Sequence, residues 1–254
     1  MENPFTLQGK RIVITGASSG IGRECAITCS KLGAAVILLG RDQSRLGETA
    51  EILPDGARHS SYSQDLTDFD QVESLVARIV QENGRIDGVI NSAGISATLP
   101  LKVSTPERLT KILDTNVTAS VNFTQIVTSK KYFAEEGGSV IFLSSVMSVV
   151  GEVAKTMYSI SKGGLLAGAR SMALELAPRK IRVNAVSPGV VESPMSKNAV
   201  YSQSEEALQR VTALHPLGLG RTEDVANACA FLLSDAARWI TGTNLIIDGG
   251  YTAR

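Results

Sequence analysis

Tyr158 and Lys162 are the two residues of this sequence whose types and spacing most directly suggest acid–base chemistry. They stand four apart, so on a helix their side chains share one face. A free phenol has a pKa of about 10, and a cation roughly 4 Å away at an effective dielectric constant near ~20 lowers it by about three pKa units before solvent screening. Tyr158 could then give and take a proton near neutral pH, as carbonyl and alcohol interconversion requires. Taken alone, such a pair is more often an inert surface feature.

The stretch "TGASSGIG" at residues 15–22 fits two kinds of site. Its "GASSG" matches the G-x-S-x-G elbow that presents a serine nucleophile in hydrolases. That elbow needs an oxyanion segment before it and a suitably placed late histidine, but "RIVIT" (11–15) is the first strand-like run and His215 lies in "LHPLG". A strand, glycines and a following helix instead favour a turn that binds a dinucleotide phosphate. Because the spacing is G-x-x-x-G-x-G, this motif alone is also compatible with an ordinary tight turn.

Seven short strand-like runs supply the scaffold for these groups, at residues 11–15, 34–39, 58–64, 88–93, 139–145, 181–187 and 244–250. Stretches of helical spacing lie between them. Such alternation predicts an α/β fold: a single Rossmann-type domain over residues 1–254, with a doubly wound parallel sheet of about seven strands and helices on both faces. In open α/β folds ligands bind at the carboxyl edge of the sheet, where the serines ending 139–145 and the following Tyr158 are expected.

Three local features of the chain predict two helix starts and a lid. "STPE" at 104–107 has the Ser-x-x-Glu arrangement of a capping box with proline in the first turn, and "TEDV" at 222–225 places two acids at a helix start. The segment 190–221 is long and poorly periodic, and we interpret it as a substrate lid within the domain.

Composition narrows the class of partner. Lysine plus arginine equals aspartate plus glutamate at 25 each, so no net field favours nucleic acid or an anionic membrane, and a small-molecule partner is expected. Cys25, Cys29 and Cys229 lack paired metal spacing and only two histidines exist, which argues against a disulfide framework or a metal site. No signal pattern and no apolar run of roughly 20 residues is present, so we expect a soluble cytoplasmic protein.

An ordered set of motifs extends over essentially the whole chain: "TGASSGIG" (15–22), "NSAG" (91–94), Asn116 in "TNV", Ser145, "YSISK" (158–162) and "SPG" (187–189). Through these motifs the sequence resembles the short-chain dehydrogenase/reductase family. The late segments "GRTEDVANACAFLLSD" and "ITGTNLIIDGG" are similar to its 3-oxoacyl-[acyl-carrier-protein] reductase branch, although much of the wider family shares them. Ser92 is a departure, because the family more often has a second asparagine there, which implies a weaker sheet contact rather than changed chemistry.

The resemblance implies a catalytic role for four residues. Tyr158 would be the acid/base, and Ser145 would hydrogen-bond the substrate oxygen. Lys162 would also hold the nicotinamide ribose, and Asn116 would support a water relay to Lys162. Ser145 is preferred over Ser144 because it lies thirteen residues before the tyrosine, the spacing of the family pattern. Ser144 is then expected to be structural.

The resemblance also implies a nicotinamide dinucleotide site. The residues expected to bind the cofactor are Gly16, Ser18, Ser19, Gly20, Ile21, Gly22, Arg41, Asp65, Leu66, Asn91, Ala93, Gly94, Tyr158, Lys162, Pro188, Gly189, Val191 and Ser193. In such folds an acid at the end of the second strand binds a free ribose 2′-OH, whereas an arginine neutralises a 2′-phosphate. Gly40 fills the acid's place and Arg41 follows, so we predict NADP in preference to NAD. NAD stays the alternative, because Asp42 could pair with Arg41 or contact a ribose.

The predicted function is that of an NAD(P)-dependent oxidoreductase interconverting a carbonyl and a secondary alcohol by hydride transfer. One candidate substrate class is a 3-oxoacyl thioester, for whose acidic carrier Arg179 could be a contact, although Glu135 and Glu136 count against carrier docking. The alternative is a small ketone, sugar, steroid or hydroxy acid. The residues expected to give the pocket an apolar wall are Met147, Met157, Val190 and Met195.

Two further expectations concern assembly and residues without a catalytic role. The family commonly assembles as tetramers, so a homo-oligomer, either a tetramer or a dimer, is expected. Cys25 and Cys29 are expected to pack in the core, His59 and His215 to serve structure, and Trp239 to pack near the last strand. A non-catalytic nucleotide-sensing regulator on the same fold is a further alternative, against which the intact serine, tyrosine and lysine set argues.

Overall fold

A seven-stranded, fully parallel sheet forms the centre of the molecule. The structure is a computed structural model and describes residues 3–54, 58–197 and 204–253. The strands are β1 (Arg11–Thr15), β2 (Ala35–Gly40), β3 (Ser60–Ser63), β4 (Gly88–Asn91), β5 (Gly138–Leu143), β6 (Ile181–Pro188) and β7 (Asn244–Ile247). The strand order is β3-β2-β1-β4-β5-β6-β7. Successive strands are added on one side of β1 up to β3 and on its other side from β4 onward, so the switch point lies between β1 and β4. A ligand cleft is expected at that switch point.

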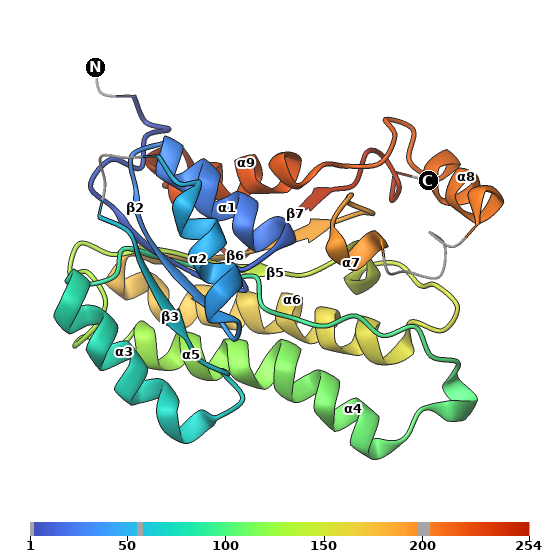
Figure 1. The fold of residues 1–254 in the computed structure, drawn as a ribbon, viewed down its shortest axis with the longest axis horizontal. Coiled ribbons are helices and arrows are strands. Elements are labelled where there is room, and N and C mark those ends of the chain that lie inside the picture. Colours follow the sequence, from blue (N-terminus) through green and yellow to red (C-terminus); the bar gives the residue numbers. More distant parts are fainter. Residues whose placement is uncertain (1–2, 55–57, 198–203, 254) are drawn as a thin grey trace.

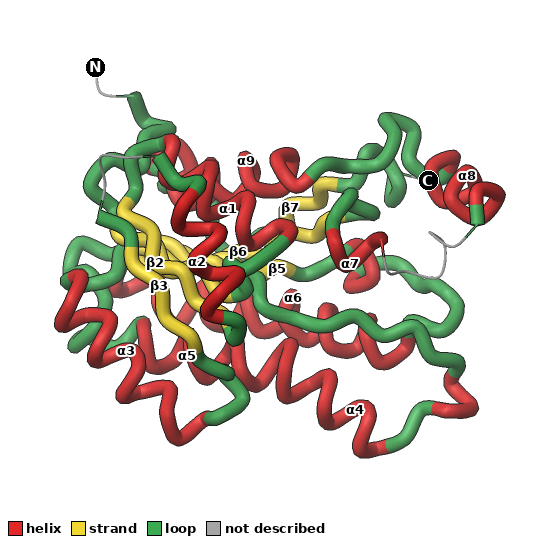
Figure 2. Tube along the Cα trace, viewed as in Figure 1, coloured by secondary structure: helices red, strands yellow, loops and turns green. Residues whose placement is uncertain are grey.

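Helices cover both faces of the sheet (Figures 1 and 2). One layer contains α1 (Gly20–Lys31), α2 (Gln43–Glu51) and α9 (Thr222–Leu233). The other contains α3 (Phe69–Asn83), α4 (Pro106–Leu113), α5 (Ala119–Val127) and α6 (Thr156–Leu176). Two further helices, α7 (Pro194–Lys197) and α8 (Glu205–Ala213), follow β6 and lie toward the right in Figure 1. The predicted doubly wound, Rossmann-type fold is therefore confirmed.

Alternating side chains of the central strands enter two separate apolar cores. Val13 of β1 packs beneath α3, α5 and α6, whereas its neighbours Ile12 and Ile14 pack with α1 and α9. Phe123 of α5 and Phe142 of β5 are fully buried in the first core. Burying one such side chain stabilises the fold by roughly 1.5–3 kcal/mol. Because both sides of the sheet are covered, central strands such as β1 and β2 read as short, mainly apolar runs in the sequence.

All seven predicted strands are present, but some sequence expectations are wrong in detail. The capping residue of α4 is Thr105 rather than Ser104, because Pro106 occupies the first helical position and the Thr105 hydroxyl accepts from the Arg108 amide at 3.4 Å. Trp239 does not pack near β7, since it is 91% exposed on the loop before that strand. Its apolar character alone led to that prediction, and single exposed apolar side chains are common on protein surfaces.

Two expectations, the helix start in "TEDV" and the packing of Cys25 and Cys29 in the core, agree with the fold. Helix α9 begins at Thr222 as predicted, and the Asp224 carboxylate accepts from the Arg221 amide at 2.7 Å. The three cysteines are all buried, between α1 and α9. Within the described ranges, none of the helices combines the length and the apolar character needed to cross a bilayer.

Candidate active site

The turn after β1 has a geometry that only glycine accommodates. Gly16 has φ 69°, and a Cβ there would lie 2.9 Å from the Ala93 nitrogen. A Cβ on Gly22 would lie 2.3 Å from the Gly16 oxygen. Helix α1 then begins at Gly20, and its N-cap Ser19 is extended and makes no side-chain capping bond. The first amides of the helix are therefore left for a ligand, as in phosphate-binding turns.

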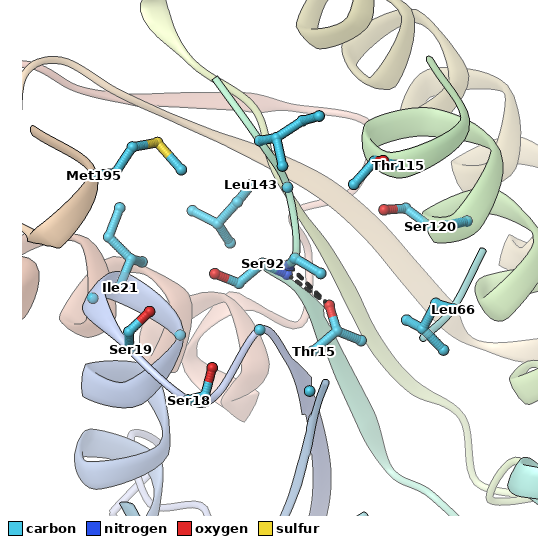
Figure 3. A pocket seen from close by; sticks show the side chains of 18 of the residues that line it. Thr15, Ser18, Ser19, Ile21, Leu66, Ser92, Thr115, Ser120, Leu143 and Met195 are labelled. Atoms are coloured by element: carbon cyan, nitrogen blue, oxygen red, sulfur yellow. Dashed lines mark hydrogen bonds between the residues drawn. The ribbon is translucent and has the colours of Figure 1, made fainter. Parts of the chain in front are cut away.

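A cleft of about 330 Å³ opens beside this turn, at the carboxyl ends of β1 and β4 (Figure 3). Figure 3 shows Ser18 and Ser19 of the turn on one side, with Thr115 and Ser120 across from them. Thr15 joins the two strand ends, because its hydroxyl accepts from the amides of Ser92 and Ala93 at 3.1 and 3.0 Å. The cleft thus lies at the switch point that the sheet topology defines.

Most of the residues predicted to bind a dinucleotide line this cleft. The lining set includes Gly16, Ser18, Ser19, Gly20, Ile21, Gly22, Arg41, Asp65, Leu66, Ala93, Gly94, Tyr158, Lys162, Pro188 and Ser193. Asn91, Gly189 and Val191 are not among the lining residues. The Asn91 amide instead donates to the Thr124 hydroxyl at 2.9 Å, and Val191 is buried in a bridge to Gly220. These side chains support the walls rather than form their surface.

Two acidic residues, Asp42 and Asp65, lie near Arg41 at the end of β2, and they make different contacts. Asp42 caps α2, because one of its carboxylate oxygens accepts from the Arg45 amide at 3.1 Å, and within the described residues it forms no ion pair with Arg41. Arg41 lies 3.6 Å from the Asp65 carboxylate, and its side chain is 69% exposed. Arg45 also lines the cleft, which the sequence reasoning missed.

Lys162 is buried beside Tyr158 on α6. Its ammonium donates to the Leu143 carbonyl at 2.6 Å and lies 5.8 Å from the centroid of the Tyr158 ring. Burial lowers the pKa of Lys162 to about 8. The Ser144 hydroxyl donates to the backbone carbonyl of Lys162 at 2.9 Å, which is the structural role expected for that serine. The lysine is thus held in place by backbone contacts, and its charge depends on what binds near it.

Ser145 lies one residue further along, where β5 leads into a short 3₁₀ helix, Val146–Ser148, that packs against α6. Its hydroxyl accepts from the Met147 amide at 3.2 Å, which caps this turn. Ser145 is buried and is not part of the cleft lining, in contrast to Ser144. The capping bond leaves the hydroxyl proton of Ser145 available for another acceptor.

Asn116 sits in a π-helical turn, Asp114–Thr118, between α4 and α5. Such turns often occur at functional sites. Its buried amide accepts from the Ile95 amide at 2.8 Å and donates to the Ile95 carbonyl at 2.9 Å and to the Ser161 hydroxyl at 3.0 Å. A Cβ on Gly94 would lie 3.1 Å from the Asn116 oxygen and 3.6 Å from the Lys162 nitrogen. Asn116 therefore joins the loop after β4 to α6, next to Lys162.

Comparisons with known proteins agree with this geometry. A family model described as "Enoyl-(Acyl carrier protein) reductase" matches residues 16–252. The 3-oxoacyl-[acyl-carrier-protein] reductase FabG of Thermotoga maritima is 37% identical over 248 residues, which cover 96% of this chain and 98% of that protein. The chain belongs to the short-chain dehydrogenase/reductase family. The resemblance drawn from its motifs is thereby confirmed.

Other short-chain dehydrogenases/reductases are similar over the same length. The L-rhamnose 1-dehydrogenase (NAD(P)(+)) of Azotobacter vinelandii is 35% identical, over 95% of this chain and 96% of that protein. A crystal structure from Beutenbergia cavernae, proposed to be an NAD(P)-dependent gluconate 5-dehydrogenase and holding NADP at low occupancy, has a TM-score of 0.92 at 30% identity, covering 99% of this chain and 100% of that one. This short-chain dehydrogenase/reductase is an NAD(P)-dependent oxidoreductase that interconverts a carbonyl and a secondary alcohol by hydride transfer.

The apolar residues predicted to line the substrate pocket of this short-chain dehydrogenase/reductase are divided by the fold. Met195 of α7 reaches the cleft, as Figure 3 shows. Met147 and Met157 are buried, and neither they nor Val190 line it. Val190 is held in place by His215, whose ring accepts from the Val190 amide at 3.2 Å. His215 thus has the structural role expected for it, supporting the loop after β6.

Proposed function

We propose that this protein is an NADP(H)-preferring reductase in which Tyr158 is the acid/base and Lys162 its supporting cation. The observation that supports this most directly is the buried ammonium 5.8 Å from the Tyr158 ring, in the wall of the cleft at the switch point. Ser145 would orient the carbonyl oxygen from the end of β5. Asn116, through its bonds to Ile95 and Ser161, would hold the loop and helix that carry the other groups in register.

The reaction then follows from the positions of these residues. When bound, the nicotinamide supplies the hydride that reduces the carbonyl carbon. Tyr158 donates its hydroxyl proton to the carbonyl oxygen as that oxygen gains charge, and it takes the proton back in the oxidation direction. The Ser145 hydroxyl donates a hydrogen bond to the same oxygen and aligns it. Lys162 in its charged form stabilises the phenolate left on Tyr158. The predicted water relay through Asn116 would return protons to Lys162.

A preference for NADP is supported by the residues at the end of β2. Gly40 presents no carboxylate to a ribose, and Asp42 directs one carboxylate oxygen to the Arg45 amide at the start of α2. Arg41 and Arg45 both line the cleft, so two cations would face a 2′-phosphate there. The Asp65 carboxylate near Arg41 is exposed enough to be displaced by a phosphate, since exposed ion pairs contribute only about 0–1 kcal/mol.

Two substrate classes are considered, a small carbonyl compound and a carrier-bound thioester, and the charges on the surface favour the small compound. A carrier protein would need cations near the pocket mouth. Arg179, the residue considered for that role, donates to the Thr128 carbonyl, and Glu135 forms an ion pair with Arg85. Neither arrangement favours an acidic carrier. We therefore propose a small ketone, sugar or steroid substrate in preference to a carrier-bound 3-oxoacyl thioester, which is the second candidate because of the similarity to FabG.

Three further parts of the proposal concern the lid, the assembly and the location. Residues 190–221 would act as a lid, which is supported by Ser193 and Met195 in the cleft wall, although 198–203 lie outside the described residues. A homotetramer or dimer is supported by exposed apolar side chains on α6, where Ile160 is 49% and Leu174 78% exposed. A cytoplasmic location stays a prediction from the sequence. The comparisons give no support to a non-catalytic regulator.

A substrate panel followed by NADPH absorbance tests the proposed function. Acetoacetyl thioesters, both free and linked to a carrier protein, simple ketones, sugar ketones and steroid ketones would be offered with NADPH and, in parallel, with NADH. We expect NADPH consumption with a small ketone, slower consumption with NADH, and little gain from a carrier-linked thioester. If the protein binds NADPH but reduces none of these compounds, the proposal is contradicted.

Lys162 should take up a proton when NADPH binds above pH 8. Burial lowers the pKa of Lys162 to about 8 in the free protein, so much of it is uncharged at about pH 8.5. Added negative charge and ribose hydroxyl acceptors favour the charged form and raise that pKa. Calorimetry in two buffers of different ionisation enthalpy measures the uptake. Lys162→Met should remove most of it, and Lys130→Met, at an exposed site after α5, should not. Equal uptake by all three proteins would refute this assignment.

A further inference from the structure

A second lysine, Lys155, lies against the ring of Tyr158, and none of the roles above uses it. Its ammonium is 5.9 Å from the centroid of that ring, almost the same distance as the 5.8 Å of Lys162. Lys155 immediately precedes α6, and Tyr158 lies in the first turn of that helix. Two ammonium groups therefore lie near the Tyr158 ring. The proposed proton transfer uses only the ammonium of Lys162.

The charge of Lys155 is balanced by no acidic side chain in contact with it within the described ranges. No carboxylate lies within 4 Å of its ammonium among residues 3–54, 58–197 and 204–253. The side chain is half-buried, and this burial lowers the pKa of Lys155, while the more distant Glu152 raises it. A partly desolvated cation is usually paired with an anion. An anion from outside the chain would therefore supply the acidic partner that Lys155 lacks in contact with it among the described residues.

The loop contacts of Lys155 hold its ammonium in place. It donates to the Thr98 hydroxyl at 2.6 Å, in the loop that follows β4. The same two loops are joined by the Leu99 amide, which donates to the Ala154 carbonyl at 2.8 Å. Ala154 has φ 66°, a left-handed conformation that residues other than glycine seldom adopt. Such a conformation persists where neighbouring contacts impose it, as is common in ligand-binding loops.

We propose that Lys155 binds a carboxylate of the substrate, so that the substrates of this site are short oxo acids and the corresponding hydroxy acids. This inference rests on the proposed function, because it requires the reacting carbonyl oxygen to lie at the Tyr158 hydroxyl. An ammonium this close to the Tyr158 ring can reach only a group a few bonds from that carbonyl. The phosphate of a pantetheine arm lies at the far end of the arm from its thioester, so the anion must be part of the substrate itself.

The reaction leaves this carboxylate unchanged. In reduction the carbonyl carbon gains a hydride, the carbonyl oxygen gains the Tyr158 proton, and NADPH becomes NADP⁺. In oxidation the hydroxy acid returns both, the hydride to NADP⁺ and the hydroxyl proton to Tyr158. Lys155 acts only by orienting the acid, through a charge-assisted hydrogen bond to a carboxylate oxygen.

Matched acids and esters test the inference. The probes are 2-oxopentanoate, acetoacetate and 4-oxopentanoate, each beside its methyl ester, which keeps the ketone and removes the charge. We expect the wild type to prefer at least one acid over its ester. Lys155→Gln should lower kcat/KM for that acid by about 10- to 100-fold, mainly through KM, and leave the ester within about threefold. Lys155→Arg, which keeps the charge, should restore most of the preference.

Control variants separate this role from a structural one. Thr98→Val keeps the Lys155 ammonium and removes its contact with the loop after β4. If Lys155 only joined the two loops, Thr98→Val would lower kcat/KM for the acid as much as Lys155→Gln does. If Lys155 instead tuned the phenol, Lys155→Gln would slow acids and esters alike and shift the pH profile. Either result overturns the inference, as does a wild type that reduces the esters no less readily than the acids. That last result leaves the proposed function intact. The proposed function would be contradicted if the protein oxidised NADPH with none of the ketones.

A binding measurement keeps the inference testable even without turnover. The three oxo acids would be titrated into the Tyr158→Phe protein with NADPH bound, and their dissociation constants read from the NADPH fluorescence. Adding Lys155→Gln should weaken binding of the preferred acid about 10-fold or more. Equal dissociation constants with and without Lys155, or no acid bound by either protein, would overturn the inference.

Discussion

Tyr158→Phe should lower kcat by about 10²- to 10⁴-fold for every carbonyl substrate that the protein reduces, which is the usual contribution of a positioned general acid. The substitution removes one oxygen, and with it the only group we propose to protonate the carbonyl. The ring stays, so its packing beside Lys162 on α6 is preserved. The dissociation constant of NADPH should therefore change by no more than about threefold, because the glycine turn and the arginines at the end of β2 are untouched.

A second tyrosine provides the matched control. Tyr132 is buried in the core, its hydroxyl lies 3.5 Å from the Glu73 carboxylate, and it is not among the residues that line the cleft. Tyr132→Phe should leave kcat within about twofold. Steady-state kinetics and NADPH fluorescence titration on the three proteins provide the comparison. If Tyr158→Phe keeps most of its turnover, or if it loses NADPH binding and turnover together, the acid/base assignment is wrong.

The sequence predicts the scaffold well because one physical pattern governs it. The strand "RIVIT" (Arg11–Thr15) is covered on both faces, so its inner positions Ile12, Val13 and Ile14 are all apolar and the run is visible in the sequence. The helix start at Pro106 shows the limit of such reasoning. Two adjacent residues there, Ser104 and Thr105, both have suitable side chains, and the proline ring decides between them.

The sequence predicts the site less completely, because a motif marks positions along the chain rather than the surface of a cleft. Gly189 ends the motif "SPG" and Val191 follows it, yet neither lines the cleft, and a Cβ on Gly189 would meet Asp248 at 3.0 Å. Arg45 and Lys155 belong to no motif, yet the fold brings them to the cleft and to the Tyr158 ring. Their roles depend on helix phase and loop contacts, which single-residue types do not reveal.

The cofactor preference should be reversed by Gly40→Asp. Gly40 ends β2, its φ is outside the left-handed region, and a Cβ there would meet Leu46 Cδ2 at 3.4 Å and Ser18 Oγ at 3.6 Å, which are ordinary contacts. The fold should therefore accept a side chain at this position. A carboxylate here repels a 2′-phosphate and accepts a hydrogen bond from a free 2′-OH. We expect the dissociation constant of NADPH to rise by about 10²-fold and that of NADH to fall, since two like charges about 4 Å apart repel by several kcal/mol.

Arg41→Ala tests the same preference from the opposite direction. It removes a cation and adds no repulsion, so NADPH should weaken by about 10-fold and NADH by less than about twofold, which corresponds to one charge-assisted contact to phosphate. Arg45→Ala should act in the same direction if both cleft arginines face the phosphate. Fluorescence titrations at two salt concentrations provide the measurement, because the arginine contributions must shrink as salt screens them. Equal weakening of NADPH and NADH in Arg41→Ala would mean that the 2′-phosphate is not bound at the end of β2, and NAD would then become the preferred assignment.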